Sequence, residues 1–298
     1  MITTRPTPVS TRRGLPAGRW FAEIGWRYLV GVAALAFAAI PILYVLSASL
    51  NPLGSVASTD LVPRQLSLVN YETLLSGQKG PFLRWYVNTV IVCVVVAATQ
   101  VFLSLLAAYA FSRMRFAGRR GGMLALLLIM MFPAVLSMIA IYVMISDLGD
   151  AVPILGLDSL PGYLLVLLGG SLGQVWLIKG FFDTVPKELD EAATIDGCTH
   201  FQLFRIILLP ALAPVIATTL LLSLVGVMSE FLLGSIFLTS NENKTLAVGL
   251  FGMLEGDRSA NLGVFAAGAV LTMIPVIALY QYLQKYIVGG STAGAVKG

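Results

Sequence analysis

Six long apolar stretches constrain the fold of this sequence more than any other feature. Each is about 20 residues or longer, and turn-forming or charged segments such as "NPLGS", "RMRFAGRRGG" and "SNENK" separate them. A helix needs roughly 20 apolar residues to cross the hydrocarbon core of a bilayer, where it satisfies its own backbone hydrogen bonds. The sequence therefore predicts an all-α, polytopic membrane protein with six transmembrane helices, at 26–50, 85–111, 123–145, 163–182, 212–238 and 262–287.

The distribution of Lys and Arg predicts the orientation. Basic residues collect in the N-terminal tail, in the loops after the second and fourth stretches, and at the C-terminal end. Because cytoplasmic loops carry the excess of positive charge, we expect both termini to be cytoplasmic. This divides the chain into a tail over 1–25, a transmembrane domain over 26–288 and a tail over 289–298, in a multi-pass protein of the cytoplasmic membrane that contacts lipid. The arginines of "FSRMRFAGRR" fit this topology signal, and nothing indicates nucleic acid.

The sequence excludes several kinds of chemistry. It has no G-x-x-x-x-G-K-[ST] phosphate loop, a single histidine and two cysteines, so it offers neither a means of hydrolysing ATP nor a catalytic metal site. We expect a chain that is not an enzyme and binds no cofactor. Any energy for its work comes from a partner.

A cytoplasmic helix-turn-helix is predicted between the fourth and fifth stretches. Pro186 suits a first helical position, and Glu188, Asp190 and Glu191 then lie in the first turns, where negative charge meets the positive end of the helix. Gly197 ends this helix, because glycine readily adopts the backbone angles of a helix terminus.

The second helix of this pair begins at once. Thr199 and Gln202 have the spacing of a capping box, and the helix is expected to run to Pro210. Its predicted apolar face consists of Phe201, Phe204, Ile207 and Leu208. The pair would present an acidic end and a small Ala-Ala patch to another protein. The alternative is an amphipathic loop on lipid headgroups, which the acidic residues disfavour because cytoplasmic leaflets are anionic.

At these residues the chain resembles the permeases of ATP-binding-cassette (ABC) importers, whose EAA motif reads E-A-A, three residues, G, nine residues, I-x-L-P. Every motif position is filled, by Glu191, Ala192, Ala193, Gly197, Ile207, Leu209 and Pro210. Further stretches resemble the smaller permease subunits of maltose/maltodextrin importers: "AYAFSRMRF", "MFPAVLSMIAIY", "VWLIKGFFDT", "TLAVG" and the terminal "TAGAVKG". This resemblance covers nearly the whole chain after its first 25 residues.

The resemblance implies that the loop 183–210 couples the chain to an ATPase. Its implied coupling residues are Glu188, Asp190, Glu191, Ala192, Ala193, Asp196, Gly197 and Pro210. Glu191 would form an ion pair with the ATPase and Gly197 would act as a rigid elbow. The implied partners are a second, larger permease, two copies of an ATPase subunit that bind ATP and Mg²⁺, and an extracytoplasmic sugar-binding protein.

Two further segments take their expected roles from the resemblance. An extracytoplasmic, scoop-like loop over 239–261 would contact the sugar-binding protein through Glu255, Gly256, Asp257, Arg258 and Ser259. The C-terminal tail would contact the ATPases through Thr292, Ala293, Gly294 and Ala295. From composition alone this glycine-rich tail is too small to hold a helix by itself, and disorder is the alternative.

Polar residues within the apolar stretches have two interpretations. Hydrogen bonding between helices explains Asn88, Gln100 and Gln174 as well as any role in transport. Glu230 is a carboxylate inside a stretch, near its outer end, where it either reaches the membrane interface or lines a cavity or gate.

The sequence leaves the transported solute open. A maltose/maltodextrin importer is the first interpretation, and importers of trehalose or another oligosaccharide are alternatives. A membrane scaffold that moves no solute is a further alternative, which the complete EAA motif disfavours.

Overall fold

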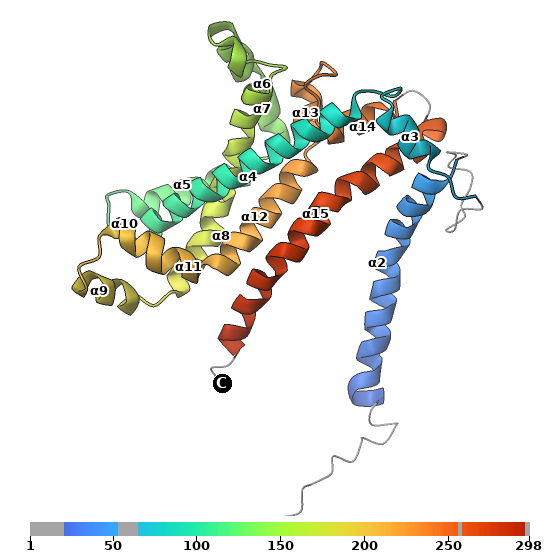
Figure 1. The fold of residues 1–298 in the computed structure, drawn as a ribbon. Coiled ribbons are helices and arrows are strands. Elements are labelled where there is room, and N and C mark those ends of the chain that lie inside the picture. Colours follow the sequence, from blue (N-terminus) through green and yellow to red (C-terminus); the bar gives the residue numbers. More distant parts are fainter. Residues whose placement is uncertain (1–20, 53–64, 256–257, 296–298) are drawn as a thin grey trace, which may run out of the picture.

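The fold is helical throughout the part of the chain that the computed structural model describes, which is residues 21–52, 65–255 and 258–295 (Figure 1). This confirms the predicted all-α class. The membrane-crossing and peripheral helices are η1 Phe21–Gly25, α2 Trp26–Leu50, α3 Val69–Leu75, α4 Phe82–Arg113, α5 Arg119–Met131, α6 Ala134–Ala151, η2 Pro153–Leu155, α7 Leu160–Leu167, η3 Leu168–Gly170, α8 Ser171–Thr184, α9 Glu188–Ile195, α10 His200–Gln202, η4 Leu203–Leu208, α11 Leu209–Ala211, α12 Ala213–Met228, α13 Leu232–Phe237, α14 Leu246–Gly252 and α15 Arg258–Ala295.

Within the described ranges, four helical segments are long and apolar enough to cross a membrane, and six qualify if each of two bent helix pairs counts as one span. The first begins at Phe21, because the π-helix η1 continues into α2. The helix therefore starts five residues before the predicted span, and residues 1–20 lie outside the described part.

The predicted third span is broken rather than continuous. Helices α5 and α6 meet at an angle of 101°. Phe132, at the break, has extended backbone angles (φ −72°, ψ 130°). Pro133 causes this, because its ring disfavours the helical conformation at the preceding residue and it has no N–H to donate.

The predicted fifth span is broken near its outer end. Helix α12 ends at Met228 and α13 starts at Leu232. Ser229 donates its hydroxyl to the carbonyl of Val225 (2.7 Å), and the Glu230 carboxylate accepts the backbone N–H of Leu233 (2.8 Å). The Ser229 hydroxyl thus adds a second donor to the Val225 carbonyl, while the Glu230 side chain takes the place of a backbone acceptor at the start of α13, and such side-chain bonds compete with the helical pattern.

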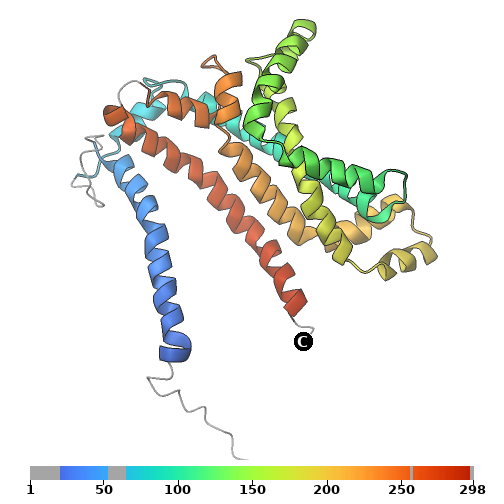
Figure 2. The same cartoon turned by 180° about the vertical axis from the view of Figure 1, so that it is seen from behind.

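Helix α4 is the centre of the packing. It lies along α8 and α12, and α15 packs against α12 on one side and α2 on the other. Figures 1 and 2 show the C-terminal end of α2 close to the start of α15, and the two helices diverge towards the N-terminal end of α2. The side chains of α2 are correspondingly exposed, as Phe37 is (80%).

One end of α4 holds the segment 241–246. Side chains from its first two turns bind the backbone of this segment, so its course is fixed by α4. The bonds run from Arg84 Nε and Asn88 Nδ2 to the Glu242 carbonyl (3.0 and 2.9 Å), from Trp85 Nε1 to the Asn241 carbonyl (2.7 Å), from Asn88 Nδ2 to the Lys244 carbonyl (3.0 Å), and from the Leu246 N–H to Thr89 Oγ1 (2.7 Å).

Asp158 ties the loop before α7 to the same segment. Its Oδ1 accepts the backbone N–H groups of Thr239 (2.9 Å) and Ser240 (3.0 Å), and its carbonyl accepts from Asn243 Nδ2 (2.5 Å). Its φ of +54° lies in the left-handed region, which Asp adopts more readily than most residues. The segment is therefore held from two sides.

Candidate functional site

The first helix of the predicted coupling pair, α9, begins two residues later than expected. Pro186 precedes the helix, and its carbonyl accepts the N–H of Leu189 (3.4 Å). Glu188, Asp190 and Glu191 occupy the first turn as predicted. Gly197 has φ +79°, and the turn there places Thr199 at the start of the second helix.

The second helix has the predicted capping box. The Gln202 N–H donates to Thr199 Oγ1 (3.3 Å), and the Thr199 N–H donates to Gln202 Oε1 (2.8 Å). A π-helical segment follows over Leu203–Leu208, in which the Leu209 N–H reaches the carbonyl of Phe204, five residues earlier.

The predicted apolar face of this helix is wrong at Phe201, which is 67% exposed. Leu203 is buried in its place, whereas Leu208 is buried as predicted and Phe204 and Ile207 are partly buried against the same core. The π-helical segment is the physical reason, because its extra residue per turn changes which side chains share a face.

Asp190 faces its own chain rather than a partner. Its Oδ2 lies 2.8 Å from Arg113 Nε at the end of α4, and only 19% of the Asp190 side chain and 6% of the Arg113 side chain are exposed. Arg113 Nη2 also donates to the carbonyl of Val185, just before α9 (2.8 Å). This ion pair fixes α9 to α4.

The Ala-Ala patch is divided between the interior and the surface. Ala193 is buried with Tyr109, Phe182 and other residues of α4, α8 and the second helix, while Ala192 is exposed. A small residue at position 193 lets α9 lie against this core. Only Ala192 is free for contact with another protein.

The outward side of the pair combines acidic and apolar side chains. We define the coupling surface as Glu188, Leu189, Glu191, Ile195 and Phe201, all exposed, with Ile195 at 86%. Asp196 and Pro210 are also exposed. Leu189 and Ile195 were not among the predicted coupling residues. Their apolar side chains in an otherwise acidic segment are a signal in the sequence that could have identified them. Exposed apolar groups beside charges, outside the spans, are typical of a protein contact.

The scoop-like loop is mostly folded against the membrane helices. Helix α14 is buried with Trp85 of α4 and with α15, and the chain then turns at Met253–Glu255, where Glu255 is exposed. Gly256 and Asp257 lie outside the described residues. Arg258 and Ser259 form the start of α15.

The C-terminal residues Thr292, Ala293, Gly294 and Ala295 form the last turn of α15. This does not contradict the expectation that the tail holds no helix by itself, because α15 begins far upstream at Arg258. These residues extend a helix that already exists, and adding a turn avoids the unfavourable nucleation step that an isolated segment faces.

Away from the helix pair, a cavity of about 1100 Å³ lies between α4, α5, α6, α7, α8, α12 and α13, and Glu230 is one of its lining residues. Gln100 and Gln174 form hydrogen bonds between helices, as that interpretation predicts, whereas Asn88 binds backbone carbonyls of the segment 241–246 and no other helix. For Glu230 the structure favours the cavity over the membrane interface.

Comparisons with known proteins agree with this arrangement. Residues 100–290 match the family described as "Binding-protein-dependent transport system inner membrane component". The chain is similar to the maltose/maltodextrin transport system permease protein MalG of Photorhabdus laumondii (37% identical, 92% of this chain and 97% of the relative) and of Escherichia coli K12 (37%, 91% and 93%). It is also similar to a chain of a bacterial ABC transporter that imports the acidic polysaccharide alginate (TM-score 0.72, 27% identical, 94% of this chain and 99% of that one).

The relatives and the solved structure match nearly the full length of the chain, and the family match over residues 100–290 also includes the coupling pair and the cavity. The chain is thus a non-catalytic, multi-pass permease of the inner membrane, and it works with partner subunits. The protein belongs to the family of inner membrane components of binding-protein-dependent ABC importers.

Proposed function

We propose that this permease imports maltose and maltodextrins. It would work with a second, larger permease, two copies of an ATPase subunit that binds ATP and Mg²⁺, and an extracytoplasmic sugar-binding protein. The MalG relatives, similar over more than nine tenths of the chain, support the substrate class. Alginate, the substrate of the solved relative, is acidic. The Glu230 carboxylate in the cavity of this chain favours a neutral sugar instead.

The observation that carries the coupling role is the anchored, outward-facing α9. The coupling surface is exposed for an ATPase, while Asp190 and Ala193 hold the same helix onto α4 and α8. A displacement of α9 by the closing ATPases is therefore passed to the transmembrane helices rather than lost in a loose loop. Rocking of one permease against the other would then expose the pathway to each side in turn.

The remaining assignments complete this proposal. Both termini would be cytoplasmic, the end of α15 would contact the ATPases, and the turn at Glu255 would face the sugar-binding protein. Shortening 255–259 should leave the complex assembled but weaken stimulation of its ATPase by the sugar-loaded binding protein. A cysteine at Ala295 should crosslink to the ATPase subunits.

The deciding experiment is uptake by the complex reconstituted in proteoliposomes with its binding protein. Radiolabelled maltose and maltotriose should be taken up and should stimulate ATP hydrolysis, whereas trehalose and an alginate oligosaccharide should do neither. Uptake of trehalose or alginate alone would reassign the substrate. ATP hydrolysis without uptake of any of these solutes would contradict the transport function.

A further inference from the structure

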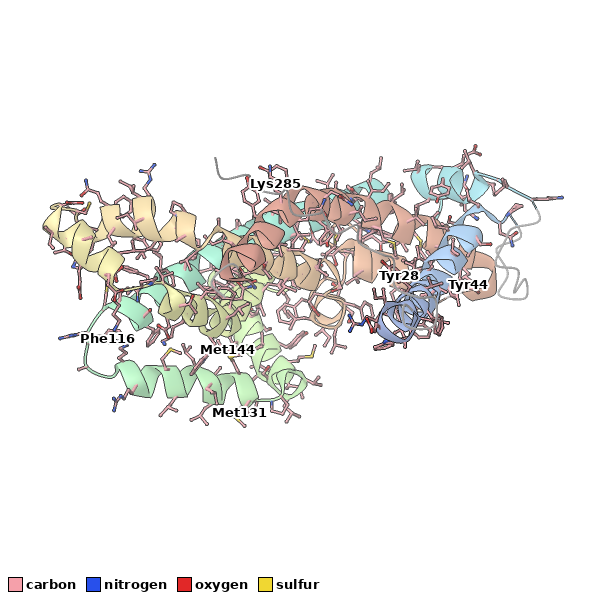
Figure 3. All side chains as sticks on the ribbon, turned by 90° about the horizontal axis from the view of Figure 1, so that it is seen from below. Tyr28, Tyr44, Phe116, Met131, Met144 and Lys285 are labelled. Atoms are coloured by element: carbon pink, nitrogen blue, oxygen red, sulfur yellow. The ribbon has the colours of Figure 1, made fainter. Side chains whose placement is uncertain are left out.

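The loop between α4 and α5 forms a small basic cavity that is separate from the coupling surface. Figure 3 shows Phe116 on this loop and Met131 at the opposite end of α5. The stretch from Ser112 to Gly122 contains no acidic residue, so positive charge is concentrated here. The cavity has a volume of about 390 Å³, and its lining residues are Arg115, Phe116, Gly118, Arg119, Arg120 and Gly121.

Arg119 fixes the shape of this loop. Its Nη1 donates to the carbonyl of Met114 (3.3 Å) and its Nη2 to the carbonyl of Ser112 (3.1 Å). These carbonyls lie at the C-terminal end of α4, where a helix lacks backbone donors and a positive charge is favourable. Gly118, with φ +86°, permits the turn from the loop into α5. The cavity is therefore built by contacts within the loop itself.

Arg115 and Arg120 remain available to a ligand. Both side chains are exposed, and neither forms an ion pair or a hydrogen bond with any residue that the structure describes. The acidic residues bonded to this end of α4, Asp183 and Asp190, are already paired with other basic side chains. Two guanidinium groups that line one cavity suit a phosphate group, since each can form two parallel hydrogen bonds with it.

The apolar surroundings of the cavity are those of a membrane surface. Met114 and Phe116 are exposed on the loop, and α5 continues with exposed apolar side chains from Leu124 onwards. Basic side chains next to an apolar span reach the headgroup region, where aromatic residues also collect. The ion pair between Arg113 and Asp190 places this loop at the same end of the molecule as α9. That end is cytoplasmic in the proposed orientation.

We propose that this cavity binds the phosphate group of an anionic phospholipid of the cytoplasmic leaflet, and that Arg115 and Arg120 are the phosphate-binding side chains. The inference rests on the orientation given under the proposed function, but not on the proposed substrate. Cytoplasmic leaflets are anionic, and basic cavities beside transmembrane helices on this side bind lipid headgroups. The acyl chains would lie along the exposed apolar side chains of α5.

A role in topology explains the charge of the loop but not its cavity, because the positive-inside rule depends on the number of basic residues and not on their arrangement. An acidic surface of the ATPase is the other candidate partner. The exposed apolar residues on both sides of the arginines favour lipid, since they would otherwise face water.

The test measures lipid binding to the complete purified complex by native mass spectrometry, without sugar or ATP. The wild type should bind phosphatidylglycerol in preference to phosphatidylcholine. Arg115→Gln and Arg120→Gln should each lower this preference about fivefold, equivalent to roughly 1 kcal/mol for one basic residue near an anionic surface. Lys79→Gln removes an exposed positive charge between α3 and α4 and should match the wild type.

Gly121→Leu distinguishes a shaped site from general attraction by charge. No atom lies within 4 Å of a Cβ placed at Gly121, so leucine would occupy the cavity while every charge stays in place. The preference for phosphatidylglycerol should fall severalfold. Gly180→Leu is the matched control, because Gly180 is also an exposed helical glycine with open space at its Cβ, and it should match the wild type.

The proposal is overturned if the arginine variants keep the wild-type preference, or if they lose it while Gly121→Leu keeps it. Displacement of phosphatidylglycerol by inorganic phosphate, but not by chloride at equal ionic strength, would assign the cavity to a soluble phosphate compound instead. Loss of the ATPase subunits from Arg115→Gln, with lipid binding unchanged, would identify a protein contact. Because the assay uses no sugar, a failure of maltose uptake would count against the proposed function alone.

Discussion

Arg113 Nε lies 2.8 Å from Asp190 Oδ2, and this ion pair joins the end of α4 to the first turn of α9. Both side chains are largely buried, so neither charge has water to replace its partner. The contact therefore determines whether α9 moves with the membrane helices or independently of them.

Removing one partner of this pair should uncouple the complex. Arg113→Ala leaves the Asp190 carboxylate buried without its counterion, which costs about 3–5 kcal/mol for a buried pair. We expect sugar uptake to fall at least tenfold. Lys79→Ala, which removes an exposed positive charge between α3 and α4, is the control and should transport normally. Uptake assays and blots of membrane fractions separate loss of coupling from loss of protein, and normal uptake by Arg113→Ala would contradict the anchoring role.

Reversing the exposed charge of the coupling surface should have a similar effect for a different reason. Glu191→Lys leaves the fold intact, because this side chain is exposed, but presents the wrong charge to the ATPase. Uptake should be abolished while the protein remains in the membrane fraction. Glu72→Lys reverses an equally exposed charge on α3 and should be neutral. Equal uptake by Glu191→Lys and Glu72→Lys would show that Glu191 makes no contact that coupling to the ATPase requires.

The effect of a substitution at Gly197 should depend on whether the new residue adopts a left-handed backbone conformation, and not on the size of its side chain. Its φ is +79°, and no atom lies within 4 Å of a Cβ placed there. A branched residue such as valine would cost about 1–2 kcal/mol or more from the left-handed conformation, whereas asparagine adopts it more readily. We expect Gly197→Pro and Gly197→Val to impair uptake strongly and Gly197→Asn mildly.

The matched control for this series is Gly180→Ala, at a helical glycine of α8 that also has open space around its Cβ. It should leave uptake unchanged, since alanine favours helix over glycine by about 1 kcal/mol. Equal uptake by the valine and asparagine variants would show that the turn at Gly197 does not require a left-handed residue.

Asp158 should give the protein a stability component that depends on pH. Burial raises the pKa of this carboxyl, but hydrogen bonds from Ser240, Thr239 and Asn243 outweigh that effect and hold the pKa below its usual value. A pKa that is lower in the folded state adds stability above the unfolded value of about 3.9, and this stability is lost as the pH falls through the folded value.

Thermal unfolding in detergent tests this relationship. The wild type should have a higher Tm than Asp158→Asn at pH 7, and the difference should shrink as the pH drops below about 4. Asparagine tolerates the φ of +54°, so the variant removes the charge without straining the backbone. A Tm difference of the same size at pH 7 and pH 3 would mean that the charge is not its source.

Local signals explain what could be predicted from the sequence. The capping box joins Thr199 to Gln202, only three residues away, and the turn at Gly197 depends on the backbone freedom of glycine itself. Both features could therefore be predicted without knowledge of the tertiary structure. The break at Phe132 could have been anticipated from Pro133. The break after Met228 contains neither proline nor glycine, and it depends on side-chain contacts that hydropathy does not reveal.

Long-range contacts explain what was missed at the site. Asp190 has the same sequence context as its exposed neighbours Glu188 and Glu191, and only its position beside Arg113, 77 residues earlier, turns it inward. The exposure of Phe201 depends on the π-helical segment that follows it, for which the residue pattern gave no signal.

Helix α4 holds a different part of the protein at each of its two ends. Its 32 residues contain neither proline nor glycine and span about 48 Å at ~1.5 Å per residue. Arg113 at one end holds the coupling pair, and Arg84, Trp85 and Asn88 at the other hold the segment 241–246. Because α4 is a continuous helix anchored at both ends, a displacement at either end is transmitted to the other. If the sugar-loaded binding protein binds at one end and the ATPases at the other, as proposed, thermodynamic linkage makes the effect reciprocal: the binding protein favours ATPase closure by the same free energy by which ATP changes the affinity for the binding protein.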